Sequence, residues 1–314
     1  MEGRMMRELA ARRRDEGVIV NLCPTGMVPD RSMTPHVPLT PAEIVTDVLG
    51  CLDRGANLVH LHARDTAGRP HYSREIYAPQ IAGIREVHPN VTICVSLSGR
   101  NFGEFAQRSD PLHLEGDLRP DMGSLTLSSL NFSGQASVNS PEMVRKLAEA
   151  MLERHIKPEL EVFDAGMVNY AHYLIGKGVL QPPFYFNILL GNLAGAQAAP
   201  AQLAAILAEL PDDSIWCLAG IGRQQLTANT LGLLFGDGVR VGLEDNIWYD
   251  DARTRLATNA DLVERVARAA ALLERPLATQ AEVRARLGIA PIAGHAARIP
   301  ALPSPAAAGY VSAP

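Results

Sequence analysis

The sequence predicts an α/β protein built as a single closed (β/α)8 barrel, the TIM-barrel fold. Eight short apolar runs alternate with longer segments of helical pattern along most of the 314 residues. Runs such as IVNLC and LVHLH are mostly apolar, which is typical of parallel strands covered on both faces. Eight strand–helix units are what a closed barrel needs, and an open doubly wound sheet is the alternative.

The expected elements follow one another in strict alternation. We expect strands at 18–23, 58–62, 92–97, 122–127, 159–163, 184–188, 215–218 and 239–242. We expect helices at 41–54, 74–87, 102–108, 141–154, 167–177, 200–209, 223–235 and 259–275. Two of these helices have clear start signals, because Thr40 and Ser140 each precede a proline and an acidic residue of the first turn. Length alone would suggest about two domains, but barrels of ~250 residues form one.

We therefore place a barrel domain at 18–288, with an N-terminal extension at 1–17 and a C-terminal arm at 289–314. The N-terminal extension is basic and has no apolar core, so we expect a surface or oligomer-contact helix rather than a secretory signal. The C-terminal arm is rich in proline and alanine from Pro291 onward, which predicts an extended arm over the barrel or a partner subunit.

Composition excludes several classes of protein. The net charge of −5 and the pI near 6.0 argue against a dominant nucleic-acid footprint. No run of 18 apolar residues predicts a transmembrane helix. The four cysteines are scattered without a CxxC pair, which favours reduced thiols in a cytoplasmic protein.

The strongest local signal is the segment VHLHARD at the end of the second predicted strand. Residues two apart on a strand face the same side, so His60 and His62 should point together into the mouth of the barrel. Two imidazoles aimed at one point form half of a metal site, and zinc is the usual occupant with His and carboxylate ligands. Two histidines that hydrogen-bond inside a packed barrel are the alternative.

A third ligand could come from the end of the eighth strand, in RVGLEDN. Glu244 and Asp245 would reach the same mouth, with Glu244 as the metal ligand and Asp245 as a base. An acidic pair that interacts with a helix dipole is the alternative for these two residues.

Other polar residues gather at the predicted strand ends. Each one alone is as well explained by hydrogen bonding inside the barrel, and only their shared position favours a site. Glycine-rich loops at 190–196 and 219–223 could hold a phosphate or simply form turns. The polar residues are Ser96, Ser98, Ser124, Thr126, Ser128, Ser129, Asn131, Glu161, Asp164 and Asn187.

Together these segments resemble the β-keto acid cleavage enzymes, whose founding activity is 3-keto-5-aminohexanoate cleavage. The likeness runs in order from about residue 18 to residue 288, and HLHARD with GLEDN is specific when both occur. The segments that carry it are PLTPAEI at 38–44, VHLHARD at 59–65, SL…NF at 124–132, EVFD at 161–164 and RVGLEDN at 240–246.

The resemblance implies a zinc-dependent barrel, usually a homotetramer, that exchanges acyl groups between a β-keto acid and acetyl-CoA to give acetoacetate and a new acyl-CoA. Its metal ligands correspond to His60, His62 and Glu244. Its arginine and its proton-transferring carboxylate correspond to Arg240 and Asp245. A hydroxyl residue that contacts the substrate corresponds to Ser124.

Two departures from the family pattern concern the substrate. The substrate-side serine aligns with either Ser96 or Ser98, and we favour Ser98 because it directly precedes Gly99. The glutamate that holds the substrate ammonium corresponds to Val28, and an apolar residue cannot stabilise a buried ammonium. We therefore expect a β-keto acid other than 3-keto-5-aminohexanoate. A second substrate carboxylate could be bound by Arg31 or Arg100, although either is equally explained as a surface arginine.

Three other functions are possible. An amidohydrolase-like enzyme also uses HxH, but on the first strand and with further histidines that the fifth and sixth strands lack here. A zinc-dependent retro-aldolase would act without CoA. A non-enzymatic binding module would need neither metal nor co-substrate.

Overall fold

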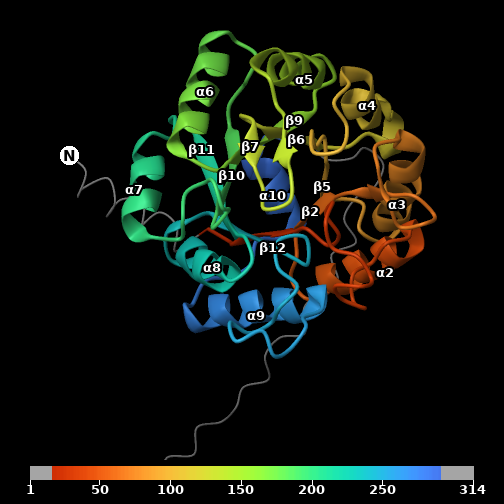
Figure 1. The fold of residues 1–314 in the computed structure, drawn as a ribbon, viewed down its shortest axis with the longest axis vertical. Helices are drawn as coiled ribbons and strands as arrows, with labels where there is room; N and C mark the ends of the chain where they lie inside the picture. Colours follow the sequence, from red (N-terminus) through yellow and green to blue (C-terminus); the bar gives the residue numbers. More distant parts are fainter. Residues whose placement is uncertain (1–15, 291–314) are drawn as a thin grey trace, which may run out of the picture.

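The computed structural model describes residues 16–290, which form a closed barrel of eight parallel strands surrounded by helices (Figure 1). The predicted fold is confirmed. Each strand pairs with the next along the chain, and the last strand pairs with the first to close the barrel. The barrel strands are β1 (Ile19–Leu22), β2 (Leu58–Leu61), β5 (Thr92–Val95), β6 (Met122–Thr126), β9 (Lys157–Val162), β10 (Phe184–Leu190), β11 (Ser214–Gly220) and β12 (Gly238–Val241).

The helices lie between consecutive strands and cover the outside of the barrel (Figure 1). The predicted starts at Thr40 and Ser140 are real caps, since each hydroxyl accepts a hydrogen bond from an N–H of the first turn. The outer helices are α2 (Pro41–Leu52), α3 (Arg74–Val87), α4 (Phe105–Ser109), α5 (Pro141–Glu153), α6 (Ala165–Gly176), α7 (Pro200–Ala208), α8 (Gln224–Phe235) and α9 (Asn259–Leu272), with 3-10 turns at Asp110–His113 and Gly116–Leu118.

Several short elements were not expected from the sequence. Two small hairpins rise from the mouth, β3 (Ala63–Arg64) with β4 (Pro70–His71), and β7 (Leu130–Asn131) with β8 (Ala136–Ser137). Strand β10 also runs two residues beyond its predicted end. Asn187 therefore lies in the middle of that strand, inside the barrel, and not at its end.

A further helix, α10 (Gln280–Arg286), closes the amino-terminal end of the barrel. Val283 and Leu287 are fully buried and belong to one apolar cluster with the first inward-facing residues of the strands, including Ile19 and Leu58. The helix lies behind the barrel in Figure 1. Burial of this apolar cluster stabilises the closed end, so the carboxyl ends of the strands are left for a site.

The predicted terminal helix and the C-terminal arm fall mainly on residues 1–15 and 291–314, which lie outside the described part of the chain. Between residues 16 and 290, no helix combines the length and apolarity that crossing a membrane requires.

Candidate active site

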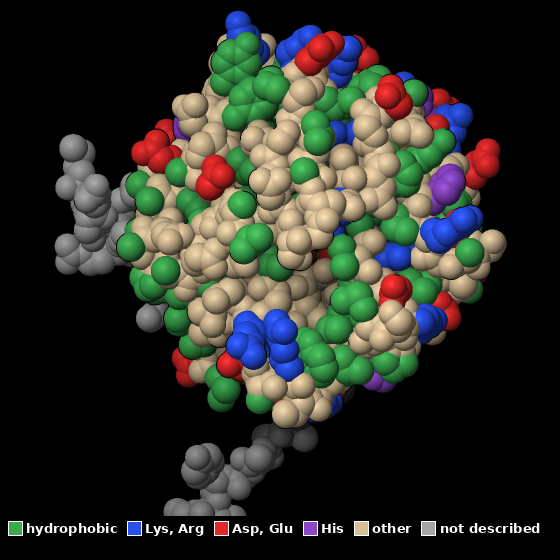
Figure 2. Space-filling model, viewed as in Figure 1, with side chains coloured by type: hydrophobic (Ala, Val, Ile, Leu, Met, Phe, Trp, Pro, Cys, Tyr) green, Lys and Arg blue, Asp and Glu red, His purple; other side chains and the backbone are tan. Residues whose placement is uncertain are grey.

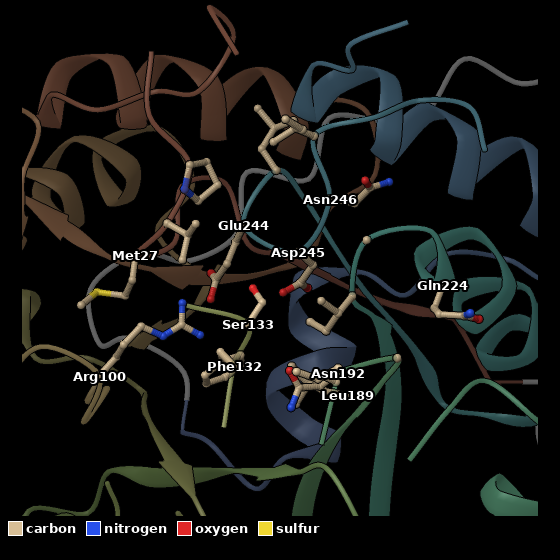
Figure 3. A pocket seen from close by; sticks show the side chains of 18 of the residues that line it. Met27, Arg100, Phe132, Ser133, Leu189, Asn192, Gln224, Glu244, Asp245 and Asn246 are labelled. Atoms are coloured by element: carbon tan, nitrogen blue, oxygen red, sulfur yellow. The ribbon is translucent and has the colours of Figure 1, made fainter. Parts of the chain in front are cut away.

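The carboxyl ends of the strands surround a cavity of about 670 Å³. It opens as the hollow near the centre of the face in Figure 2, and Figure 3 shows residues that line it. Its walls come from loops after β1, β5, β6, β10, β11 and β12. This is the end at which barrel enzymes form their active sites.

At the floor of the cavity the structure brings together the three predicted metal ligands. The Nε2 atoms of His60 and His62 lie 3.2 Å apart, and His62 Nε2 lies 3.1 Å from Glu244 Oε1. Glu244 Oε2 lies 4.0 Å from His60 Nε2. Three potential ligand atoms, from β2, from the residue that follows it and from the loop after β12, therefore converge on one point.

A second carboxylate fixes the orientation of His60. Glu159, in the middle of β9, is fully buried, and its Oε2 lies 2.5 Å from His60 Nδ1. Asn21 and Asn187 donate to its other oxygen at 2.7 Å and 2.5 Å. Because both amides are donors, the carboxylate is held ionised as an acceptor, and His60 carries its proton on Nδ1. The lone pair of His60 Nε2 then faces Glu244, as in the carboxylate–histidine pairs of zinc sites.

The residues at the floor fit a divalent metal. Two imidazoles and one carboxylate form a usual zinc donor set with one position left for a substrate. Glu244 Oε2 is buried and has no hydrogen-bond partner, which is costly unless a cation binds it. Although burial favours the neutral acid, Arg240 and the imidazoles hold the pKa of Glu244 well below its usual value.

A deeper group of potential ligands, His60, Cys94 and Glu159, is a poorer metal site. Burial and the neighbouring Glu159 raise the pKa of the Cys94 thiol well above its usual value, so the thiol stays protonated. Its Sγ donates to Glu159 Oε2 at 3.3 Å. His60 belongs to both groups, and the group formed by His60, His62 and Glu244 is the better candidate for a metal site.

Arg240 links the floor carboxylates. Its Nε and one terminal nitrogen hold the two oxygens of Asp245 at 3.0 Å and 3.2 Å, and that terminal nitrogen lies 2.7 Å from Glu244 Oε1. Burial would lower the pKa of Arg240, but Asp245 and Glu244 raise it, so the guanidinium keeps its charge. Cys23 donates to Asp245 Oδ2 at 3.2 Å. Asp245 is thus held in one orientation beside Glu244 (Figure 3).

Glu161 lies on the far side of Arg240. Its Oε1 is 3.4 Å from the guanidinium, and its Oε2 accepts a hydrogen bond from Thr126 at 2.5 Å. Burial raises the pKa of Glu161, and Arg240 opposes that rise. Burial therefore acts on two neighbouring glutamates with different net results, a raised pKa for Glu161 and a lowered one for Glu244.

The serines that were predicted as site residues lie at different depths in the barrel. Ser96 and Ser98 both line the cavity, so the choice between them is still open. Ser124 does not line the cavity, because its hydroxyl points to the neighbouring strand and accepts the Leu97 N–H at 3.0 Å. Thr126, two residues farther along β6, presents the hydroxyl at the cavity wall.

The two arginines that were considered for a second carboxylate are placed differently. Arg31 bonds to Pro35 and Glu43 and is not part of the cavity wall, so it is a surface arginine. Arg100 lines the cavity, as does Val28 in the loop after β1. Arg100 lies near Met27 in Figure 3.

Asn259 holds the loop that carries Glu244. Its Oδ1 accepts the Leu243 N–H at 2.8 Å, and its Nδ2 donates to Pro24 O and to Asp47 Oδ2 at 3.0 Å and 2.7 Å. The loops after β1 and β12 are thereby tied together behind the site. Sequence reasoning missed Asn259, because the residue stands out only by its place at the start of a predicted helix.

The fold and the site define this protein as a barrel enzyme whose ionisable residues gather at the carboxyl ends of its strands. Residues 17–289 match the family model described as beta-keto acid cleavage enzyme. The 3-keto-5-aminohexanoate cleavage enzyme of Acetoanaerobium sticklandii is 34% identical over 275 residues, which cover 87% of this chain and 99% of that protein. The chain belongs to the beta-keto acid cleavage enzyme family.

Other relatives show how far the likeness extends. The 3-oxoadipate:acetyl-CoA acetyltransferase of Cupriavidus necator is 35% identical over 275 residues, covering 86% of this chain and 94% of that protein. The apo structure of ObcA superposes with a TM-score of 0.72 at 21% identity and covers 81% of this chain and 66% of the ObcA chain. At that identity the ObcA likeness shows the shared fold alone.

Proposed function

We propose that this enzyme binds zinc and transfers the acyl group of a β-keto acid to CoA. The reaction is R–CO–CH2–COO⁻ plus acetyl-CoA, which gives R–CO–CoA plus acetoacetate. The observation that carries this proposal is the convergence of His60, His62 and Glu244 beside the Arg240–Asp245 pair, at the floor of a cavity. Family membership and the names of the relatives support it.

Asp245 is placed to move the proton. Its carboxylate is oriented by two hydrogen bonds from Arg240, and it faces the cavity. We assign to it the removal of a proton from the carbon between the keto and carboxylate groups. That carbon then attacks the acetyl-CoA carbonyl and CoA thiolate leaves. The thiolate then attacks the keto carbon of the original acid. The bond between this keto carbon and the carbon that Asp245 deprotonated breaks, and Asp245 returns its proton to the acetoacetate enolate that leaves.

Zinc, when bound by His60, His62 and Glu244, would polarise the keto oxygen and stabilise enolate charge. The chain itself supplies the remaining contacts. Ser96, Ser98 and Thr126 offer hydroxyl groups along one wall for the substrate carboxylate. Ser124 supports that wall through the Leu97 backbone and acts as a positioning residue.

Acetyl-CoA needs cationic contacts for its phosphates, and the mouth offers two. Arg223, in the loop after β11, and Arg253, in the loop after β12, both line the cavity at its rim. Their side chains are exposed, and Arg223 meets a carboxylate only at 3.9 Å, from Asp251. Basic side chains border the hollow in Figure 2. Loops after the seventh and eighth strands are the usual place for phosphates in barrel enzymes.

The wall that faces the substrate tail favours a tail without an ammonium group. Met27 and Val28 offer no negative charge there, so an ammonium would lose its hydration without a partner. The Acetoanaerobium relative is named for an aminohexanoate and the Cupriavidus relative for 3-oxoadipate. The family therefore contains enzymes named for tails of different charge, and we propose that this enzyme belongs with those that do not bind an amine.

The homotetramer and the cytoplasmic location that the resemblance implies are part of the proposal. Multi-angle light scattering of the purified full-length chain tests the first, and a tetramer mass is the expected result. Fractionation of the cells that produce the protein tests the second, with recovery in the cytoplasmic fraction expected.

The decisive experiment measures acetyl-CoA consumption by the purified, zinc-loaded protein with a panel of β-keto acids. Glu244→Gln should lose zinc, because an amide is a weak zinc ligand. Asp245→Asn should keep zinc and lose turnover by roughly 10²-fold or more, the usual size of general-base catalysis. Equal cleavage without acetyl-CoA would identify a retro-aldolase instead. Turnover of Asp245→Asn near the wild-type rate would refute the role given to that residue.

A further inference from the structure

Arg100 is a half-buried cation of the cavity wall that has no anionic partner. Its Nε is buried and makes no hydrogen bond, and no carboxylate between residues 16 and 290 lies within ion-pair distance of its guanidinium. Arg240 at the floor is by contrast held by Asp245, Glu244 and Glu161. Arg100 therefore keeps its charge available for an anion.

The guanidinium of Arg100 is directed at the floor of the cavity. The residue belongs to the loop after β5, and Figure 3 shows its side chain reaching toward the carboxylate of Glu244. Burial lowers the pKa of Arg100, and the carboxylates of the floor oppose this fall, Glu244 first and then Glu161 and Asp245. The floor charges thus act on this guanidinium, and the strongest of them is the one toward which it points.

Three neighbours hold Arg100 in place before a ligand arrives. The ring of Phe132 stacks on the guanidinium, with its centre 3.7 Å from the central carbon, and so restricts the plane of the group. Gln135, from the same hairpin turn, donates to the carbonyl oxygen of Arg100 at 3.1 Å. The backbone N–H of Arg100 donates to Ser98 Oγ at 3.3 Å. The Ser98 hydroxyl therefore keeps its own proton for another acceptor, on the same turn as the guanidinium.

A β-keto acid brings a carboxylate to the floor itself. One methylene group separates this carboxylate from the keto carbon, so it must lie beside whatever group binds the keto oxygen. There it meets the acidic side chains of Glu244, Asp245 and Glu161, all three of which already share Arg240. A further anion at this place is unfavourable unless another cation compensates for it.

We propose that Arg100 binds the carboxylate that all β-keto acids share, with the Ser98 hydroxyl as a second donor, and that this ion pair protects the substrate from decarboxylation. The proposal rests on the proposed function for the position of the keto oxygen. A planar guanidinium binds a carboxylate through two parallel hydrogen bonds. A second carboxylate in the tail is not required, so the proposal sets no condition on the charge of the tail.

The ion pair decides between two reactions of one substrate. A polarised keto group favours loss of carbon dioxide as well as loss of a proton, because both leave an enolate. In decarboxylation the bond between the methylene carbon and the carboxylate breaks, and its electron pair stays on the methylene carbon. That carbon takes up a proton, so R–CO–CH2–COO⁻ plus H⁺ gives R–CO–CH3 plus CO2.

The carboxylate loses its charge in decarboxylation and keeps it when Asp245 removes a proton. A guanidinium that stabilises this charge therefore raises the barrier to the first reaction and leaves the second available. Arg100 would in this way act on the choice of reaction as well as on binding.

The first test follows the acyl-CoA and the methyl ketone formed by the zinc-loaded enzyme from the β-keto acid of the panel that reacts best. Arg100→Met should raise the KM for the keto acid roughly 10- to 100-fold, since a charge-assisted contact is lost. It should also raise the ratio of methyl ketone to acyl-CoA several-fold after the uncatalysed rate is subtracted. Arg100→Lys should recover part of both effects, because it restores the charge without the planar fork.

Arg31→Met is the matched control, because that arginine lies outside the cavity, and it should change neither the KM nor the product ratio. An unchanged product ratio in a folded Arg100→Met protein would refute the protective role. An unchanged KM would refute the contact with the carboxylate.

A binding experiment tests the contact without turnover. Acetoacetate and acetoacetamide have nearly the same size, but only acetoacetate carries a charged carboxylate. In calorimetric titrations without CoA, the zinc-loaded wild-type protein should bind acetoacetate at least tenfold more tightly, and Arg100→Met should remove most of that preference. Equal binding of both compounds to the wild-type protein, or a preference that survives in Arg100→Met, would refute the role of Arg100 while acetyl-CoA consumption still upholds the proposed function. A preference that depends on Arg100 in a protein that consumes no acetyl-CoA would uphold the contact and refute the proposed function.

Discussion

Replacing Glu159 by glutamine is expected to weaken zinc binding without touching a metal ligand. The carboxylate accepts from Asn21 and Asn187 on one oxygen and from His60 and Cys94 on the other. Glutamine keeps one acceptor oxygen, and the two amide donors will hold it. Its NH2 group then faces His60 Nδ1, so the imidazole must move its proton to Nε2.

A proton on Nε2 blocks the atom that would ligate zinc. Keeping the metal-binding tautomer would instead set two donors against each other and lose a charge-assisted hydrogen bond worth about 1.5–3 kcal/mol. Zinc affinity should therefore fall by roughly 10- to 100-fold, the range found when a partner of a zinc-bound histidine is removed.

Competition with a fluorescent chelator measures this affinity, and nitrogen NMR of the histidines reports the tautomer directly. Asp121→Asn is the matched control. This buried carboxylate pairs with Arg85 and Arg284 at the closed end of the barrel, so its loss should lower stability and leave zinc affinity unchanged. A zinc affinity of Glu159→Gln within twofold of the wild-type value, in a folded protein, would refute the tautomer argument.

Two further predictions concern stability and the co-substrate. Burial raises the pKa of Asp47 to about 6 from 3.8, against its hydrogen bond from Asn259, so its ionisation opposes folding and stability falls as pH rises from about 4 to 6. Asp47→Asn should therefore raise the melting temperature above pH 6 and have little effect near pH 4. The gain in stability above pH 6 should be at most about 3 kcal/mol, and smaller because solvent reaches this half-buried group. An equal effect at both pH values in a thermal denaturation series would contradict this. Joint replacement of Arg223 and Arg253 by methionine should raise the KM for acetyl-CoA several-fold, most strongly at low salt, and leave kcat nearly unchanged. An unchanged KM at low salt would show that the CoA phosphates bind elsewhere.

The barrel was predictable from the sequence because its strands are compact, mostly apolar runs that alternate with helical patterns, and two of the helices, α2 and α5, also carry clear start signals. The unexpected elements are short. Helix α10 has only 7 residues, and each strand of the two hairpins has 2, which is too little for a periodic pattern to appear.

Within the site, the direction in which a strand residue points could be predicted from the sequence, and His60, His62 and Glu244 do lie together. The depth of a side chain in the barrel could not be predicted in this way. Ser124 and Thr126 face the same side of β6, yet only Thr126 reaches the cavity. Glu159 was missed although a signal existed, since glutamates alternating with leucine and valine in β9 must both point inward.

The different environments of Arg31 and Arg100 could not be predicted from the sequence. They depend on tertiary neighbours that come from distant segments of the chain. One meets Glu43 and Pro35 at the surface, and the other meets Phe132 inside the cavity.

The closed amino-terminal end of the barrel has a kinetic consequence for the proposed exchange. With α10 sealing one end, both substrates and both products share the mouth of the cavity as their passage. In the proposed reaction the keto acid would lie deepest, and the long CoA arm would occupy the passage above it. Molecules must then leave in the reverse of the order in which they arrive, which is the pattern of a compulsory-order reaction with the acid first in and acetoacetate last out.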